Sequence, residues 1–269
     1  MSEARETGMR LPGGLPIRAL IPNAITAAAL GFGLTGIRFA ITGDWEKAVL
    51  AVMLAGILDG LDGRVARALK AQSRFGAELD SLADNVSFGV APALILFLWS
   101  LQELPRVGWY ASLAFAICCA LRLARFNAQI DTVEQPHKSA GFLTGVPAPM
   151  GAGLAFLPFY LWLATGLPEF REPLVVGGWL MLMAFLLISS VATLSWTSLR
   201  PRRSIRLELL ALLGIVGAAL LNEPWWTLAG ICVVYLLTLP YAMWSYARVK
   251  RQRAARPGMA TVASAPVDS

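Results

Sequence analysis

The sequence predicts an all-α polytopic membrane protein, and three observations carry this prediction. Hydrophobic residues fill 57% of the 269 positions and charged residues only 15%, whereas about 25% of the residues in a soluble domain are charged. The apolar residues gather in stretches long enough for a helix to cross a bilayer. The stretches do not alternate polar and apolar positions as the strands of a transmembrane β-barrel do. A soluble globule, a disordered chain and a coiled coil are therefore excluded.

Eight apolar stretches are predicted to span the membrane. The external connections are short, and the longest internal loop covers about residues 128–146. They cover residues 21–42, 46–67, 76–101, 107–127, 147–166, 173–197, 205–221 and 225–246. A cleavable signal is not expected, because the N-terminus lacks a short apolar core followed by a small-residue cleavage site. We therefore expect the first stretch to remain as a membrane helix.

The distribution of Lys and Arg predicts how these helices are oriented. Most of the 23 basic residues lie in the N-terminal lead, in alternate connections and in the tail, which share one side of the membrane. The other side has only Lys47, Arg106 and Arg171. Because basic residues favour the cytoplasmic side, both termini are expected in the cytoplasm. The net charge of +6 thus reflects membrane topology, and no nucleic-acid partner is expected.

Four aspartates make residues 58–84 the most informative stretch. Asp59 and Asp62 are three residues apart, and Asp80 and Asp84 are four apart, so each pair lies on one helical face. The short connection between the two helices makes them antiparallel neighbours, with both pairs at a similar depth. Placing carboxylates that repel one another near hydrocarbon costs free energy unless a cation neutralises their charge. We therefore expect these side chains to converge around positive charge.

The residue types around the aspartates favour a hard divalent cation and a phosphate ligand. Three cysteines and one histidine are too few for a disulfide framework or a Cys/His zinc site, whereas oxygen ligands suit Mg²⁺ or Mn²⁺. Two such ions would balance four carboxylates and would suit displacement at phosphorus. Arg67 offers a fixed cation to a phosphate oxygen, and Gly63, Ala66 and Gly76 leave room beside the backbone. The alternative is a set of interfacial salt bridges between helix-end Asp and Arg residues.

The pattern Asp59-x2-Asp62-Gly63-x2-Ala66-Arg67-x8-Gly76-x3-Asp80-x3-Asp84 resembles the complete signature of the CDP-alcohol phosphotransferase family. Members of this family transfer a phosphatidyl or similar phosphoryl group from a CDP-linked donor to an alcohol and release CMP. The resemblance implies a core of six transmembrane helices that is commonly a homodimer. The expected organisation is a cytoplasmic segment (1–20), the core (21–200), two additional transmembrane helices (201–247) and a disordered cytoplasmic tail (248–269).

The same resemblance implies roles for individual residues. The four aspartates would hold two divalent cations, Mg²⁺ or Mn²⁺, and Asp84 would also be the catalytic base. The CDP-donor site would be lined by Gly63, Ala66, Arg67 and Gly76. Asn23 lies in the stretch Pro22–Thr26, which also resembles a segment common in the family. It would contact the nucleotide or a phosphate, or else cap the first helix.

Three wider segments bear on the alcohol acceptor. Residues 75–99, 120–127 and 141–149 resemble the membrane-integral phosphatidylserine synthases of bacteria. This resemblance implies CDP-diacylglycerol and L-serine as substrates and the bacterial cytoplasmic (inner) membrane as the location, with the active site facing the cytoplasm. The residues expected to contact serine are Arg122, Arg125, Asn127 and Ser87. Membrane anchoring for the arginines and core packing for the serine are the alternatives.

The signature determines the donor, so other acceptors stay open, namely glycerol 3-phosphate, inositol phosphate and choline. A cation-coupled transporter is the alternative from another class, because intramembrane aspartates often mark ion pathways. Against a transporter, the acids all lie toward one interface, and the stretches lack the paired discontinuous helices of many transporters. A membrane enzyme that acts on a CDP-linked lipid is the interpretation the residues favour.

Overall fold

The structure is a computed structural model that describes residues 17–130, 142–189, 192–194 and 206–254. These residues are almost entirely helical, which confirms the predicted all-α class. They divide into two compact units. The first consists of Met1–Asp131 together with Pro147–Ile188, and the second of Thr132–Val146 together with Ser189–Ser269.

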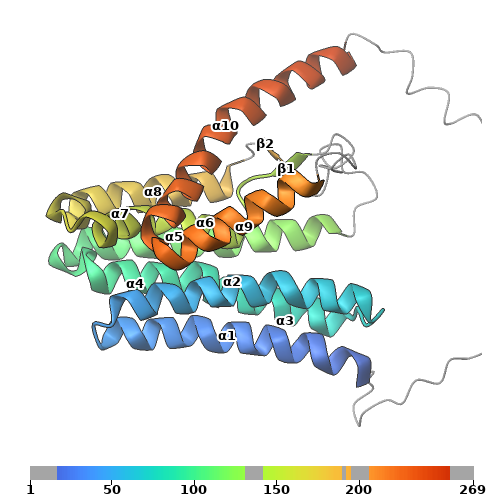
Figure 1. Ribbon diagram of the computed structural model, residues 1–269, viewed down its shortest axis with the longest axis horizontal. Helices are drawn as coiled ribbons and strands as arrows, with labels where there is room; N and C mark the ends of the chain where they lie inside the picture. Colours follow the sequence, from blue (N-terminus) through green and yellow to red (C-terminus); the bar gives the residue numbers. More distant parts are fainter. Residues whose placement is uncertain (1–16, 131–141, 190–191, 195–205, 255–269) are drawn as a thin grey trace, which may run out of the picture. The chain divides into compact units, whose positions relative to one another are not determined.

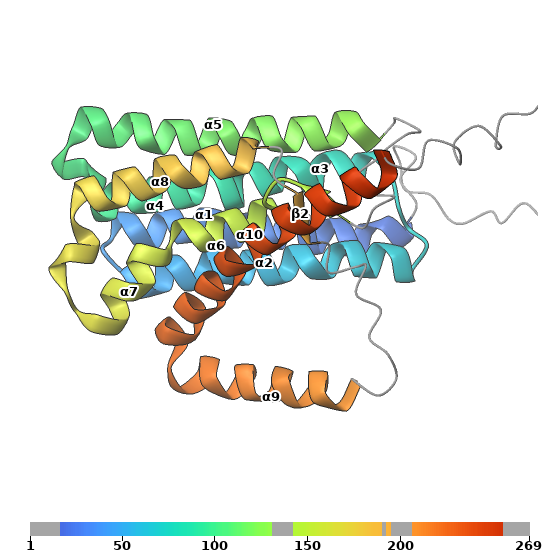
Figure 2. The same ribbon diagram turned by 90° about the horizontal axis from the view of Figure 1, so that it is seen from above.

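The first unit is a bundle of long helices that run side by side (Figures 1 and 2). In it α1 and α2 make the most extensive helix pair, and α5 packs against α8. Its helices are α1 (Leu20–Ile41), α2 (Trp45–Ala68), α3 (Arg74–Asp84), α4 (Ala91–Trp99), α5 (Pro105–Ile130), α6 (Ala148–Ala155), α7 (Leu157–Thr165) and α8 (Pro173–Ile188).

The second unit contains a short ladder and two further helices. Strands β1 (Phe142–Thr144) and β2 (Ala192–Leu194) pair antiparallel, with Leu143 opposite Thr193. Helices α9 (Arg206–Asn222) and α10 (Pro224–Ala254) follow and meet at a sharp turn at residue 223 (Figure 2). Pro224 begins α10, where a missing backbone N–H costs nothing.

Four helical segments are long and apolar enough to cross a membrane: Leu20–Ile41, Arg74–Trp99, Pro105–Ala128 and Ala148–Thr165. The segments Pro173–Ile188, Leu210–Asn222 and Pro224–Pro240 are apolar but shorter. Helix α2 has the length of a span but carries the charged residues of the signature. The protein is therefore a membrane protein with several candidate transmembrane helices, and the eight separate spans stay a prediction.

One predicted stretch is wrong in its extent. Residues 173–197 were expected to form a single apolar helix, but α8 ends at Ile188, and Ala192–Leu194 instead form the strand that pairs with Phe142–Thr144. Alanine, threonine and leucine fit either structure in isolation, so pairing with a segment distant in sequence decides between them. Most of the predicted internal loop, 128–146, and the end of the tail lie outside the described residues.

Helix α1 approaches its neighbours through a stripe of small residues. Ala29, Gly33, Gly36 and Ala40 recur three or four positions apart, and all are buried. A Cβ atom on Gly33 would lie 2.5 Å from Ser87 Oγ, and one on Gly36 would lie 2.9 Å from the Ala48 carbonyl oxygen. Small residues at such spacing let membrane helices approach closely. This stripe therefore sets the distance from α1 to the helices that carry the aspartates.

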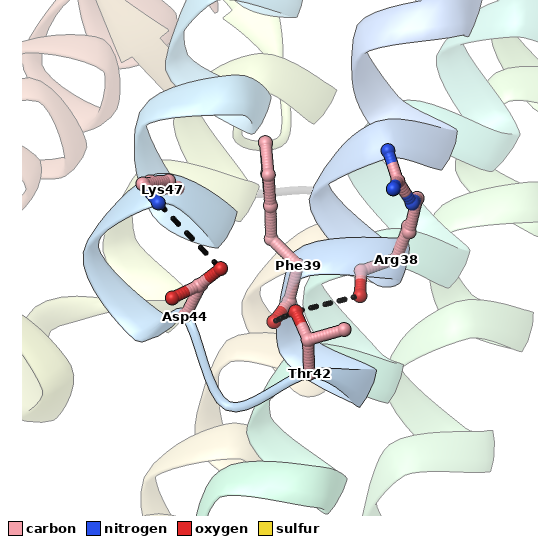
Figure 3. A network of polar contacts seen from close by, with 5 residues as sticks. All are labelled: Arg38, Phe39, Thr42, Asp44 and Lys47. Atoms are coloured by element: carbon pink, nitrogen blue, oxygen red, sulfur yellow. Dashed lines mark hydrogen bonds and ion pairs between the residues drawn. The ribbon is translucent and has the colours of Figure 1, made fainter.

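The turn between α1 and α2 is held by local polar contacts (Figure 3). Thr42 Oγ1 donates to the Phe39 carbonyl at 3.0 Å, and the same carbonyl accepts the Asp44 N–H at 2.9 Å. The Lys47 ammonium lies 3.6 Å from the Asp44 carboxylate and 5.8 Å from the centre of the Phe39 ring. These contacts close a tight antiparallel hairpin, which places the start of α1 beside the end of α2.

Two of the spans are interrupted, in each case close to a proline. In Arg74–Trp99, residues Asn85–Val90 form a π-helical segment in which the Ala91 N–H donates to the Val86 carbonyl, and Pro92 follows. In Ala148–Thr165, Pro158 cannot donate to the Leu154 carbonyl. The Trp179 indole N–H donates to that carbonyl instead, at 2.8 Å. The first interruption begins directly after Asp84, and π-helical segments often occur at functional sites.

The small-residue stripe generates a stability prediction. We expect Gly33→Ala to destabilise the protein by about 1–3 kcal/mol, the usual cost of overpacking, because its Cβ would meet Ser87. Gly31→Ala is the matched control on the same helix, since a Cβ there meets nothing within 4 Å. The midpoint of thermal unfolding in detergent measures both variants. Equal midpoints would contradict the proposed close contact between α1 and the π-helical segment.

Candidate active site

Three carboxylates converge where α2 and α3 lie together. One carboxylate oxygen from each of Asp59, Asp62 and Asp80 lies within 4.8 Å of the other two. Asp62 is buried, with 5% of its surface exposed, and the other two are half-buried. Because the connection between α2 and α3 is short, the acidic residues of both helices lie at the same level along the bundle. The structure thus brings together three of the four aspartates singled out by their spacing.

The fourth aspartate, Asp84, lies one helical turn beyond Asp80 and just before the π-helical segment. It is outside the cluster of three, but its carboxyl group is within hydrogen-bonding reach of Asp59. Asp84 therefore lies beside the acidic cluster.

The donor set fits a hard divalent cation. No ion pair between these four carboxylates and a Lys or Arg side chain is found among the residues that the structure describes. Three carboxylates this close repel one another strongly, all the more so where they are partly buried. Oxygen ligands at this spacing match the preference of Mg²⁺ and Mn²⁺. The cluster is thus an acidic group able to bind a divalent metal ion.

A polar pocket of about 330 Å³ adjoins the cluster. It is formed by the first turns of α1, the last turns of α2 and the start of α3. All five residues predicted to hold the CDP donor line it, together with two of the aspartates: Asn23, Gly63, Ala66, Arg67, Gly76, Asp62 and Asp80. Asn23 and Ala66 therefore face the same cavity, although they are 43 positions apart in the sequence.

Local structure explains how the pocket is shaped. Ser73 caps α3, because its Oγ accepts the Gly76 N–H at 3.0 Å. The Asn23 side chain lies over Gly76, where an added Cβ would be 2.9 Å from Asn23 Oδ1. Arg67 folds back along α2 toward Gly63. Helix α1 begins at Leu20, so Asn23 is inside the helix and the alternative that it caps the helix is wrong.

The residues expected to contact the acceptor lie apart from this pocket lining. Arg125 Nη1 donates to the Ile188 carbonyl at 3.1 Å, which links α5 to α8. Asn127 Nδ2 donates to Ser81 Oγ at 2.8 Å, which links α5 to the helix that carries Asp80. Arg122 is half-buried on the same end of α5. Ser87 is buried against α1, and its hydroxyl donates to the Ala29 carbonyl at 3.4 Å.

Three polar residues of the pocket lining were not predicted as site residues. Ser73 could have been found, because a serine directly before a helix is a typical N-cap signal. Gln72 precedes it in the connection and also lines the pocket. Thr26 faces both the pocket and Asp62, and its place in the stretch Pro22–Thr26, which resembles a family segment, was the signal that could have found it.

The fold and the site together define an integral membrane protein with an acidic centre beside a polar pocket. Comparison with protein families makes the class specific. Residues 19–195 match the family described as CDP-alcohol phosphatidyltransferase, and residues 204–240 match the one described as CDP-alcohol phosphatidyltransferase 2. The chain belongs to the CDP-alcohol phosphatidyltransferase family.

Several curated relatives carry the same name, CDP-diacylglycerol–serine O-phosphatidyltransferase. The protein from Mycobacterium tuberculosis is 39% identical over 233 residues, covering 83% of this chain and 78% of its own length. The one from Helicobacter pylori is 37% identical, with 64% and 70% covered. The one from Bacillus subtilis is 39% identical, with 52% and 75% covered.

The pocket geometry generates a binding prediction. We expect Gly76→Ala to weaken the affinity for CDP about tenfold, the equivalent of about 1.4 kcal/mol, because the new Cβ would displace Asn23 and press on Ser73. Isothermal titration calorimetry of the purified protein measures this change. Gly60→Ala is the control, since its Cβ meets nothing within 4 Å and Gly60 is outside the pocket lining. An unchanged affinity in Gly76→Ala would remove Gly76 from the nucleotide site.

Proposed function

We propose that this chain is a phosphatidylserine synthase, a CDP-diacylglycerol–serine O-phosphatidyltransferase. It transfers the phosphatidyl group of CDP-diacylglycerol to the hydroxyl of L-serine and releases CMP. The observation that carries this proposal is the sequence identity of 38–39% to relatives of that name, which extends across 83% of the chain. The acidic cluster and the adjoining pocket support it, because phosphoryl transfer from a nucleotide needs both a cation site and a nucleotide site.

The pocket is the proposed donor site. A cavity of about 330 Å³ offers room for a nucleotide head group, and the acyl chains of the donor stay in the bilayer. Arg67 supplies positive charge for a phosphate oxygen. Gly63, Ala66 and Gly76 let the ligand approach the helix backbones, and Asn23 offers an amide to hydrogen-bond to it.

The aspartates are the proposed cation site. Asp59, Asp62, Asp80 and Asp84 would hold two divalent cations, Mg²⁺ or Mn²⁺. When bound, such cations neutralise the diphosphate of the donor and the departing phosphate of CMP. The protein contributes the placement of α2 and α3, which holds carboxylates from both helices together beside the pocket before substrate binds.

Asp84 is the proposed general base. A serine hydroxyl is a weak nucleophile, so a carboxylate that accepts its proton makes attack easier. The bond from the serine oxygen to the phosphorus of the phosphatidyl group forms, the bond from that phosphorus to the CMP oxygen breaks, and the serine proton passes to the Asp84 carboxylate. We propose one displacement at phosphorus, with Asp84, one helical turn from Asp80, as the acid that accepts the proton.

Serine would be recognised from the cytoplasmic end of α5. Arg122 and Arg125 carry the positive charge that its carboxylate requires, and Asn127 is hydrogen-bonded to the helix that carries Asp80. Ser87 is proposed as a more remote support, because its hydroxyl is engaged with α1.

The remaining proposals concern the setting of the enzyme. We propose eight spans with both termini and the active site on the cytoplasmic side of the bacterial inner membrane, in a homodimer. The core would extend over 21–200 after a short segment, 1–20. Two further helices, 201–247, and the tail 248–269 would follow. The distribution of Lys and Arg supports this orientation.

The reaction is tested by CMP release from the purified protein in detergent with CDP-diacylglycerol and Mn²⁺ or Mg²⁺. We expect release with L-serine and not with glycerol 3-phosphate, inositol phosphate or choline, and we expect EDTA to abolish it. Release with one of the other acceptors would keep the family and the donor but reject serine. Absence of release with every acceptor, from folded protein, would reject the enzyme assignment.

The role of Asp84 generates a second prediction. We expect Asp84→Asn to lower the turnover number about 10²–10⁴-fold, the usual contribution of a general base, because an amide cannot accept the serine proton. Asp44→Asn is the matched control, since Asp44 is exposed and forms an ion pair with Lys47, away from the acidic cluster. If Asp84→Asn retains most of the wild-type turnover, Asp84 is not the base.

A further inference from the structure

Helix α1 contributes no carboxylate to the acidic cluster, yet it contacts one of them directly. Thr26 Oγ1 lies 2.6 Å from Asp62 Oδ2. Both residues are buried, each with 5% of its surface exposed. The two residues are 36 positions apart, and only the packing of α1 against α2 brings them together.

The hydroxyl of Thr26 has one proton and two acceptors within reach. Its Oγ1 is 2.6 Å from Asp62 Oδ2 and 3.1 Å from the Pro22 carbonyl in its own helix. Hydrogen bonds from a hydroxyl to an ionised carboxylate are short, about 2.5–2.7 Å, and roughly twice as strong as neutral ones. The proton therefore points to Asp62.

Other threonines of the described helices behave differently. Thr35, Thr165 and Thr227 donate to the carbonyl four positions earlier at 2.6, 2.6 and 2.7 Å. The corresponding distance for Thr26 is longer, 3.1 Å, and its shortest contact is the carboxylate. Thr26 thus keeps a longer intrahelical contact and makes its shortest contact with a residue of the acidic cluster.

We propose that Thr26 is a positioning residue of the divalent-cation site, which holds the Asp62 carboxylate in the orientation that ligates the cation. A carboxylate has two oxygens and about four acceptor positions, so the bond to Thr26 fixes its rotation and leaves positions for the metal. Such supporting bonds typically change metal affinity 10–100-fold when they are removed. This inference rests on the proposed function to the extent that the acidic cluster binds the divalent cofactor.

The test is a titration of the full-length protein with Mn²⁺. The electron paramagnetic resonance signal of free Mn²⁺ measures how much of the ion has bound. Thr26→Val keeps the shape of the side chain and removes the hydroxyl, and Thr26→Ser keeps the hydroxyl. We expect Thr26→Val to raise the dissociation constant at least tenfold and Thr26→Ser to stay within about twofold of wild type. Thr35→Val, which removes only an intrahelical bond, is the matched control and should bind Mn²⁺ as wild type does.

The Mn²⁺ concentration required for CMP release gives a second readout and should shift in parallel. Wild-type affinity in Thr26→Val would overturn the proposal, and so would an equal loss in Thr26→Val and Thr26→Ser, which indicates a packing role. If wild type binds Mn²⁺, Thr26→Val weakens binding and no acceptor supports CMP release, the proposed function fails while the role of Thr26 stands. If CMP is released but no Mn²⁺ binds, the role of Thr26 fails while the reaction stands.

Discussion

Repulsion among carboxylates held close together is the constraint on which the rest of this structure depends. Asp59, Asp62 and Asp80 offer oxygens within 4.8 Å of one another, and Asp62 is almost fully buried. Such an arrangement is unfavourable in an apolar bundle unless a cation binds. The scaffold must therefore supply enough packing energy to hold these groups together until cation and substrate arrive.

That packing comes from small residues and short connections. Gly33 and Gly36 let α1 approach the π-helical segment and α2 to distances that a side chain would prevent. The hairpin at Thr42–Asp44 and the connection that Ser73 caps keep neighbouring helices antiparallel (Figure 3). As a result, one end of the bundle collects the acids, the polar pocket and the hydroxyl of Thr26.

Periodicity made much of the site predictable. The spacing of Asp59 with Asp62 and of Asp80 with Asp84 placed each pair on one face, and a short connection placed the pairs side by side. The pocket lining also contains every residue that the resemblance to the family signature assigned to the donor. The end of α8 was less predictable, because the pairing of Ala192–Leu194 with Phe142–Thr144 is a contact between distant segments.

The sequence by itself determined the membrane class, the helical fold and the chemistry of the acidic residues, because composition and spacing are local properties of the chain. Only the tertiary structure decided which three carboxylates cluster, that Asn23 covers Gly76, and that Thr26 bonds to Asp62. Each of these contacts joins different helices. Their relative rotation and depth depend on how side chains interlock across the interface, which no single helix encodes.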